Sequence, residues 1–253
     1  MTDLDITLDG HVGILTIMRP PHNYFDADLI CAIADALENF DRDEKCRAVV
    51  LCSEGKSFCV GGDFGEEGEK ADLEMIRYLY SNGSRLFQRK KPMIAAIQGA
   101  AIGGGLGLAL TADMRVACED AYFMANFTKL GIHPGFGSSY TLPRLVGPSR
   151  AALIFYSSRR IGGQQASDWG LADKLVPLEE VRAASIEFAR EIGLCAPLAV
   201  QDIHATLMKG VADNVAQAID HELSRQTENF ETKDFKEGVR SFKERRPAEF
   251  VGS

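Results

Sequence analysis

The sequence has 253 residues, enough for one large domain or two small ones, and its composition is that of an ordinary globular protein. Its formal net charge of −8 argues against a general nucleic-acid binder, which normally carries an excess of basic residues. No apolar run approaches the length of a membrane span. From the charge we expect no nucleic-acid partner, and from the lack of an apolar run we expect no membrane partner.

The six cysteines are scattered, and none belongs to a CxxC pair. Because no histidine cluster accompanies them, we expect free thiols and no metal site. The acidic start MTDLDITLDG lacks the apolar stretch of a secretory leader. These features together favour a cytoplasmic protein.

In chain order, the first predicted elements are strands over 5–9 and 12–17, which an Asp-Gly turn joins into a hairpin. Asp26 can cap a helix over 27–40, where apolar residues recur at helical spacing. The wholly apolar run 48–52 is typical of a strand that is covered on both faces. This order of elements predicts a βαβ unit and an α/β fold.

The alternation continues before the chain becomes helical. We expect a helix over 72–87, a buried strand over 92–98, a glycine-led helix to about 112 and a strand over 114–117. The later segments are predicted as helices over 141–145, 148–157, 163–169, 178–192, 197–209, 211–231 and 232–243, with a short strand over 174–176. The predicted division is therefore an α/β core over 1–195 and a helical region over 196–253.

The stretch 101–113, AIGGGLGLALTAD, places glycines where a buried strand meets a helix. Such a junction leaves backbone N–H groups bare, and the missing side chains let a ligand come close. Three explanations remain open: an oxyanion hole, a phosphate cradle, or a close contact between helix and strand. The phosphate explanation is the weakest of these, because neither the P-loop nor the dinucleotide fingerprint is complete.

A second pair of glycines, Gly61 and Gly62, follows a turn at Gly55. An oxyanion hole needs donors from two separate segments of the chain. Gly62 and Gly104 are therefore the candidate donors.

Five stretches spread over nearly the whole chain carry the pattern of a known family. They are GKSFCVGGDF, KPMIAAIQGAAIGGGLGLALTADMRVA, KLGIHPGFGSSYTLPRLVGPSRA, IGGQQASDWGLADKLVP and GVRSFKERRPAEF. This pattern resembles the crotonase, or enoyl-CoA hydratase/isomerase, superfamily. The resemblance implies a spiral of ββα units, a C-terminal helical trimerisation region, and a homotrimer or a dimer of trimers.

The resemblance also implies an acyl-CoA substrate, with coenzyme A as part of that substrate and no permanently bound cofactor. The N–H groups of Gly62 and Gly104 would hold the thioester oxygen as it becomes an enolate. For coenzyme A, backbone around Phe58, Val60 and Phe64 would meet the adenine end. Cations at Arg245, and more loosely Lys56 and Arg246, would meet the phosphates; a solvated basic tail is the alternative.

The sequence departs from the hydratase pattern at both acid positions, which fall at Gly107 and Phe127. Neither residue can transfer a proton, so hydration by two glutamates is not expected. His133 is the first candidate replacement, because an imidazole titrates near neutral pH; the alternative is a loop histidine bonded to backbone.

The patch around His133 resembles naphthoate synthases, in which an aspartate occupies its place and a serine that of Ser138. Ser138 and Tyr140 are further candidates for orienting a substrate oxygen, against helix capping and packing as alternatives. The leading hypothesis is an acyl-CoA enzyme acting through an enolate. A CoA-ester hydrolase, C–C lyase or decarboxylase using His133, a catalytically silent acyl-CoA-binding subunit, and a nucleotide-binding domain are the alternatives.

Overall fold

The computed structural model describes residues 3–62 and 73–253. Within them, the main sheet has the spatial order β1-β2-β3-β4-β6-β9. Its strands are β1 Leu4–Asp9, β2 Val12–Ile17, β3 Ala48–Ser53, β4 Met93–Ile97, β6 Met114–Ala117 and β9 Lys174–Leu175. β1 and β2 are antiparallel, and every later pair in this sheet is parallel.

The first predicted elements are confirmed. β1 and β2 form a hairpin in which Asp9 pairs with Val12, and Gly10 adopts a φ of +61° in the turn. Helix α1 spans Ala27–Arg42, and the Asp26 carboxylate caps it by accepting a hydrogen bond from the Leu29 amide at 2.8 Å. β3 is buried along its whole length and runs parallel to β2, as a βαβ unit requires.

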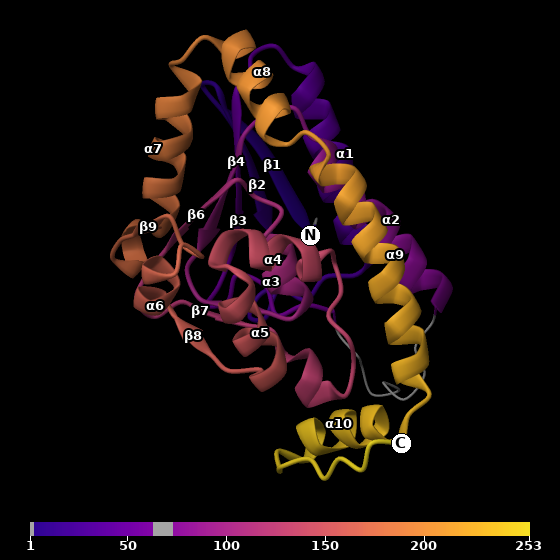
Figure 1. Ribbon diagram of the computed structural model, residues 1–253. Coiled ribbons are helices and arrows are strands. Elements are labelled where there is room, and N and C mark those ends of the chain that lie inside the picture. The colour runs from indigo at the N-terminus through magenta and orange to yellow at the C-terminus, as the bar shows by residue number, and fades with distance from the viewer. Residues whose placement is uncertain (1–2, 63–72) are drawn as a thin grey trace.

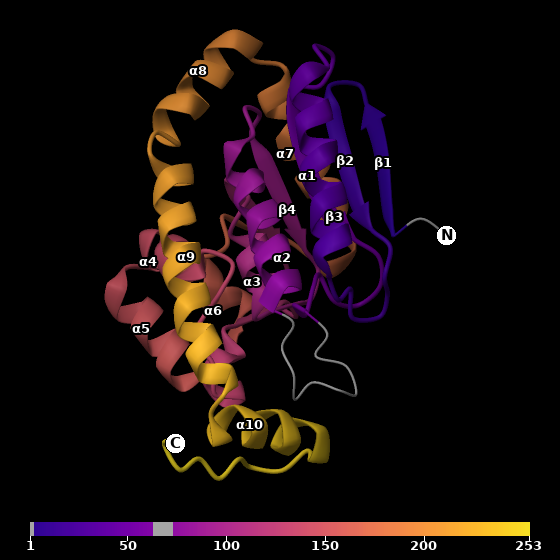
Figure 2. The same cartoon turned by 90° about the vertical axis from the view of Figure 1, so that its right-hand side faces the viewer.

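Helices cover both faces of the main sheet (Figure 1). Helix α7, Val181–Gly193, packs against β2, β3, β4 and β6. Helix α1 lies on the opposite face, and α2, Leu73–Arg85, packs against α1 (Figure 2). This double cover explains why the central strands are wholly apolar.

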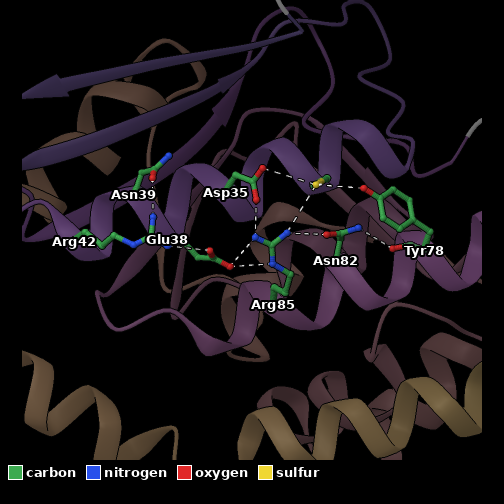
Figure 3. Close-up of polar contacts among 8 residues, drawn as sticks. Asp35, Glu38, Asn39, Arg42, Tyr78, Asn82 and Arg85 are labelled. Carbon is green, nitrogen blue, oxygen red and sulfur yellow. Dashed lines mark hydrogen bonds and ion pairs between the residues drawn. The ribbon is translucent and has the colours of Figure 1, made fainter.

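Arg85 joins α1 and α2 on their outer side (Figure 3). Its guanidinium donates to Asp35 and to Glu38, each at 2.6 Å. Because both carboxylates are exposed to solvent, this network orients α2 on α1 and adds little to stability.

A small second sheet contains β5 Ala100–Ile102, β7 Tyr122–Met124 and β8 Ile161–Gly162. β5 was not predicted, because three residues between β4 and the glycines are too short for a recognisable periodicity. Helix α3, Gly104–Ala109, ends before the expected 112. The chain turns after Leu110, and this turn brings Asp113 beside the start of β4. There the Asp113 amide donates a hydrogen bond to the Met93 carbonyl at 2.9 Å.

The later helices follow the predicted order. They are α4 Ser138–Val146, α5 Pro148–Ser157, α6 Gly163–Asp168, α8 Pro197–Leu207, α9 Val211–Phe230 and α10 Lys233–Glu244. α9 packs against α2 and α4, and α10 packs against the 3₁₀ turn Asn126–Leu130 (Figure 2). These contacts cross the predicted boundary at 195, and the division into two parts stays a prediction. None of the helices in the described ranges is both long and apolar enough for a transmembrane span.

Candidate functional site

The two glycine segments lie against each other. The Cys59 amide donates to the Ala100 carbonyl, and the Ile102 amide donates to the Cys59 carbonyl, both at 3.0 Å. A Cβ on Gly61 would lie 3.1 Å from the Gly104 nitrogen, and a Cβ on Gly105 would lie 2.1 Å from the Cys59 carbonyl oxygen. Glycine is therefore required here because two stretches of backbone are in contact.

Gly62 and Gly104 both line one cavity of about 750 Å³. Gly104 is the first residue of α3, so its N–H has no acceptor within the helix. Neither the Gly62 nor the Gly104 N–H has a hydrogen-bond acceptor among the residues that the structure describes. The structure thus brings together the two donors that the sequence singled out.

The rest of the cavity wall is mostly apolar. It is built by α2, by the turn at 126–130 and the loop after it, and by α9 and α10. The apolar side chains in this wall include Ile76, Leu79, Leu130, Ile132, Phe230, Phe235, Val239 and Phe242. Such a wall excludes water and strengthens electrostatic interactions inside the cavity.

Asp26 is the only carboxylic acid among the described lining residues, and its side chain is already engaged. It caps α1 and accepts a hydrogen bond from Arg19 at 2.8 Å. Burial raises the pKa of Asp26, but the hydrogen bonds from Arg19 and Leu29 outweigh this effect and lower the pKa overall. The described wall therefore offers no carboxyl group that is poised to move a proton near neutral pH.

The two positions of the missing glutamates are filled in different ways. Phe127 lines the cavity. Gly107 is covered by Phe136, because a Cβ on Gly107 would lie 2.8 Å from the Phe136 Cβ. An aromatic ring therefore takes up the space beside α3 into which a side chain at 107 would extend.

His133 faces a different pocket from the one that contains the glycines. It lines a surface pocket together with Ser139 and Asn229, and its amide donates to the Asn229 side-chain oxygen at 2.8 Å. Its Nδ1 lies 2.8 Å from the Pro134 carbonyl oxygen, and its ring packs edge-on against His221. Burial lowers the pKa of His133 more than the contact with Pro134 raises it. Its catalytic role stays a prediction that this geometry does not support.

Ser138 and Tyr140 are also absent from the described lining of the glycine cavity. Ser138 is fully buried, and its hydroxyl donates to the Gly135 carbonyl at 2.7 Å. The Tyr140 ring packs under the Arg144 guanidinium on α4. Tyr140 thus packs as its alternative expects, whereas Ser138 does not cap α4: it is the first residue of that helix, and the cap position is Gly137.

The predicted coenzyme A contacts are distributed unevenly. Val60 lines the cavity, whereas Phe58 is fully buried in the core. Lys56 and Arg245 are exposed and do not line the described cavity wall. Phe64 lies outside the described residues, as does the acidic run that follows it.

Lys129 and Lys243 line the cavity, although the sequence analysis did not select them. Lys129 comes from the turn at 126–130 and Lys243 from the end of α10, and both are exposed to solvent. Because α10 packs against that turn, two cations from distant parts of the chain flank one cavity.

Glu222 is a further group that sequence reasoning missed. It lies on α9, is fully buried, and accepts hydrogen bonds from the Gly137 amide at 2.7 Å and the Ser139 amide at 2.9 Å. It thus caps the start of α4 from more than 80 residues away in sequence. No local pattern contains this signal, because the acceptor and the donors lie on different helices.

We expect the Glu222 carboxyl to make stability depend on pH. Burial raises its pKa from 4.5 to about 6, despite the hydrogen bonds to Ser139 and Gly137, which lower it. Its contribution to the free energy of unfolding is complete below pH 4.5 and is lost as the pH rises through 6. Relative to Glu222→Gln, the wild type should lose about 2 kcal/mol over this range.

Urea unfolding at several pH values measures this difference. Glu228→Gln provides a control, because it removes an exposed carboxylate from the same helix. A difference between wild type and Glu222→Gln that stays constant from pH 4 to 7 would contradict the assignment.

Residues 8–253 match the family described as enoyl-CoA hydratase/isomerase. The chain belongs to this family. The resemblance to the crotonase superfamily and the predicted fold are thereby confirmed.

The similar proteins in this family cover the chain almost end to end. A probable enoyl-CoA hydratase of Bacillus subtilis is 32% identical, and the alignment covers 100% of both chains. A 1,2-epoxyphenylacetyl-CoA isomerase of Escherichia coli is 29% identical over 95% of each chain. The crystal structure of an enoyl-CoA hydratase/isomerase from Pseudoalteromonas atlantica has a TM-score of 0.88 and 29% identity, covering 99% of this chain and 100% of the other. Membership in the family therefore fixes the fold but leaves the reaction open.

Proposed function

We propose that this protein is an enzyme for acyl-CoA thioesters that stabilises a thioester enolate between the Gly62 and Gly104 N–H groups. The observation that supports the proposal is that Gly62 and Gly104 line one largely apolar cavity, and that neither N–H has an acceptor among the described residues. A donor of this kind typically stabilises the transition state by about 3 kcal/mol, because it is already oriented before charge develops. Coenzyme A is then part of the substrate.

The reaction we propose differs from hydration by two carboxylates. The ring of Phe136 covers Gly107, Phe127 stands at the second position, and the Asp26 carboxylate is engaged elsewhere. Decarboxylation, C–C cleavage and thioester hydrolysis all use an oxyanion hole without requiring that pair of acids. In decarboxylation of a malonyl-type thioester, the C–C bond to the carboxylate breaks, CO₂ is released and the electron pair forms the enolate, so no group has to remove an α-proton. The enolate then takes a proton from water.

A catalytically silent acyl-CoA-binding subunit is the second candidate. The same lack of an available carboxylate among the described lining residues favours it. It shares the cavity and the two donors with the enzyme, but it predicts binding without turnover.

A panel of CoA thioesters distinguishes these functions. We expect tight binding of CoA esters, turnover of a 3-keto- or malonyl-type thioester, and little hydration of crotonyl-CoA. His133→Ala should leave turnover unchanged, since its ring faces another pocket. Rapid hydration of crotonyl-CoA would contradict the account of the missing acids, and binding without any turnover would favour the silent subunit.

We further propose that Lys129 and Lys243 attract the phosphates of coenzyme A, because both flank the cavity and remain exposed.

We also propose that the protein self-associates. Large apolar side chains are exposed on α8, among them Leu198, Ile203 and Leu207, and on α5 Tyr156 is 80% exposed. A trimer would have three times the 27.6 kDa mass of the chain, and a monomeric mass in light scattering would contradict it. A cytoplasmic location stays a prediction.

A further inference from the structure

The ring of Phe136 occupies a slot that two helices leave open for it. A Cβ on Gly83, in α2, would lie 3.2 Å from the ring, and a Cβ on Gly107, in α3, would lie 2.8 Å from the Phe136 Cβ. A glycine inside a helix such as α2 costs about 1 kcal/mol relative to alanine. The ring of Phe136 needs this space, which explains why residue 83 is a glycine.

The backbone of Phe136 is strained. Its φ is +61°, in the left-handed region that bulky residues rarely adopt, although glycine stands on either side of it. Such a conformation persists only where the surroundings hold it, and it occurs preferentially at functional sites. The side chain is nevertheless only 1% exposed, so the strain presents a ring to the interior and not to solvent.

Phe136 lies close to the proposed oxyanion hole. Its ring centroid is 5.4 Å from that of Phe25, and Phe25 in turn packs against the Gly104 backbone. On its other side the ring meets Tyr80 edge-on at 6.4 Å. All three rings line the glycine cavity, so they form an aromatic part of its wall near Gly104.

We propose that Phe136 closes the inner end of the cavity and thereby selects CoA thioesters with short apolar acyl groups. The inference rests on the proposed function, because it assumes that the acyl group enters this cavity. An acyl chain whose carbonyl oxygen is bound by Gly62 and Gly104 would extend along the apolar wall until it meets the ring. Phe136 is thus a specificity-determining residue, and the space beside Gly107 is closed rather than left for a catalytic side chain.

The test measures binding of saturated CoA thioesters from acetyl- to decanoyl-CoA by calorimetry. Wild-type affinity should rise about fourfold per added methylene and then stop rising once the chain meets the ring. In Phe136→Ala the rise should continue to longer chains, so that the ratio of octanoyl- to butyryl-CoA affinity increases at least about tenfold.

Two further variants serve as a substitute and as a control. Phe136→Gly removes the ring and also relieves the strained φ, so it serves if the alanine variant does not fold. Tyr78→Ala removes a ring from α2 that is 48% exposed and is not among the residues lining the cavity, and it should leave the chain-length limit unchanged. If CoA esters bind and the limit does not move in either Phe136 variant, this inference is wrong and the proposed function stands. If no CoA ester binds to the wild type, both are wrong.

Discussion

Replacing Gly104 by proline is expected to lower kcat/KM on the best thioester substrate about 100- to 1000-fold below that of Gly104→Ala. Proline lacks the N–H group, so the proposed hole keeps only the Gly62 donor. Because the oxygen gains its full charge only in the transition state, we expect the loss mainly in kcat rather than in KM.

Alanine is the matched control for this substitution. Both side chains place a Cβ about 2.5 Å from the Phe25 ring, so alanine reproduces the displacement that the Cβ imposes. Gly104 is the first residue of α3, where proline is tolerated because its missing N–H has no acceptor within the helix. The comparison therefore accounts for the added Cβ, and the remaining difference is the loss of the N–H together with the Cδ that takes its place.

Steady-state kinetics and calorimetry on both variants measure the effect. Equal kcat/KM values for the proline and alanine variants would show that the Gly104 N–H does not stabilise the transition state. A loss confined to CoA-ester binding would assign Gly104 to ground-state binding and would also contradict the proposed role.

The parts of the fold that were predicted correctly rest on local patterns. Alternation identifies β2, helical spacing and the Asp26 cap identify α1, and an apolar run identifies β3. Gly62 and Gly104 were proposed as donors from the same kind of evidence, because glycines at a junction between strand and helix are visible in the sequence. The two glycines lie near each other because Cys59 pairs with Ala101 in the strand β5, which was not predicted.

The features that were not predicted depend on contacts between distant segments. Phe136 fills the space beside Gly107 although it lies almost 30 residues away in the sequence. The sequence shows the glycine, but it does not show which side chain packs against it. Glu222 caps α4 from α9 for the same kind of reason. His133 has the chemistry of a catalytic residue, but its Nδ1 lies against the Pro134 carbonyl and it lines another pocket, so its catalytic role stays a prediction. Residue type alone does not fix the direction of a side chain.

Asp113 provides the largest expected effect on stability. Its carboxylate accepts hydrogen bonds from the Arg89 guanidinium and from the Met93 amide, both at 2.7 Å, and lies 3.2 Å from His204 Nε2. It therefore joins the start of β4 to the residue before β6 and to α8. Burial raises the pKa of Asp113, but the charge of Arg89 and the contact with His204 outweigh this and hold the pKa well below its ordinary value.

We expect Asp113→Ala to lower the free energy of unfolding at pH 7 by about 3–5 kcal/mol. The main cause is Arg89, whose side chain is only 1% exposed and would lose its carboxylate partner inside the protein. The contribution of Asp113 is present above its ordinary pKa of 3.8 and is lost as the pH falls toward the lowered value in the folded state. Urea unfolding of the variant and the wild type at pH 7 measures the difference.

The exposed pair of Arg225 and Glu228 supplies the control for this prediction. Their side chains are 2.6 Å apart, a shorter separation than that of Arg89 and Asp113, yet both remain largely exposed. Glu228→Ala should therefore cost less than about 1 kcal/mol. If Asp113→Ala were no more destabilising than Glu228→Ala, the explanation by burial of the Arg89 charge would be wrong. Asp113 would then contribute no more to stability than an exposed carboxylate does.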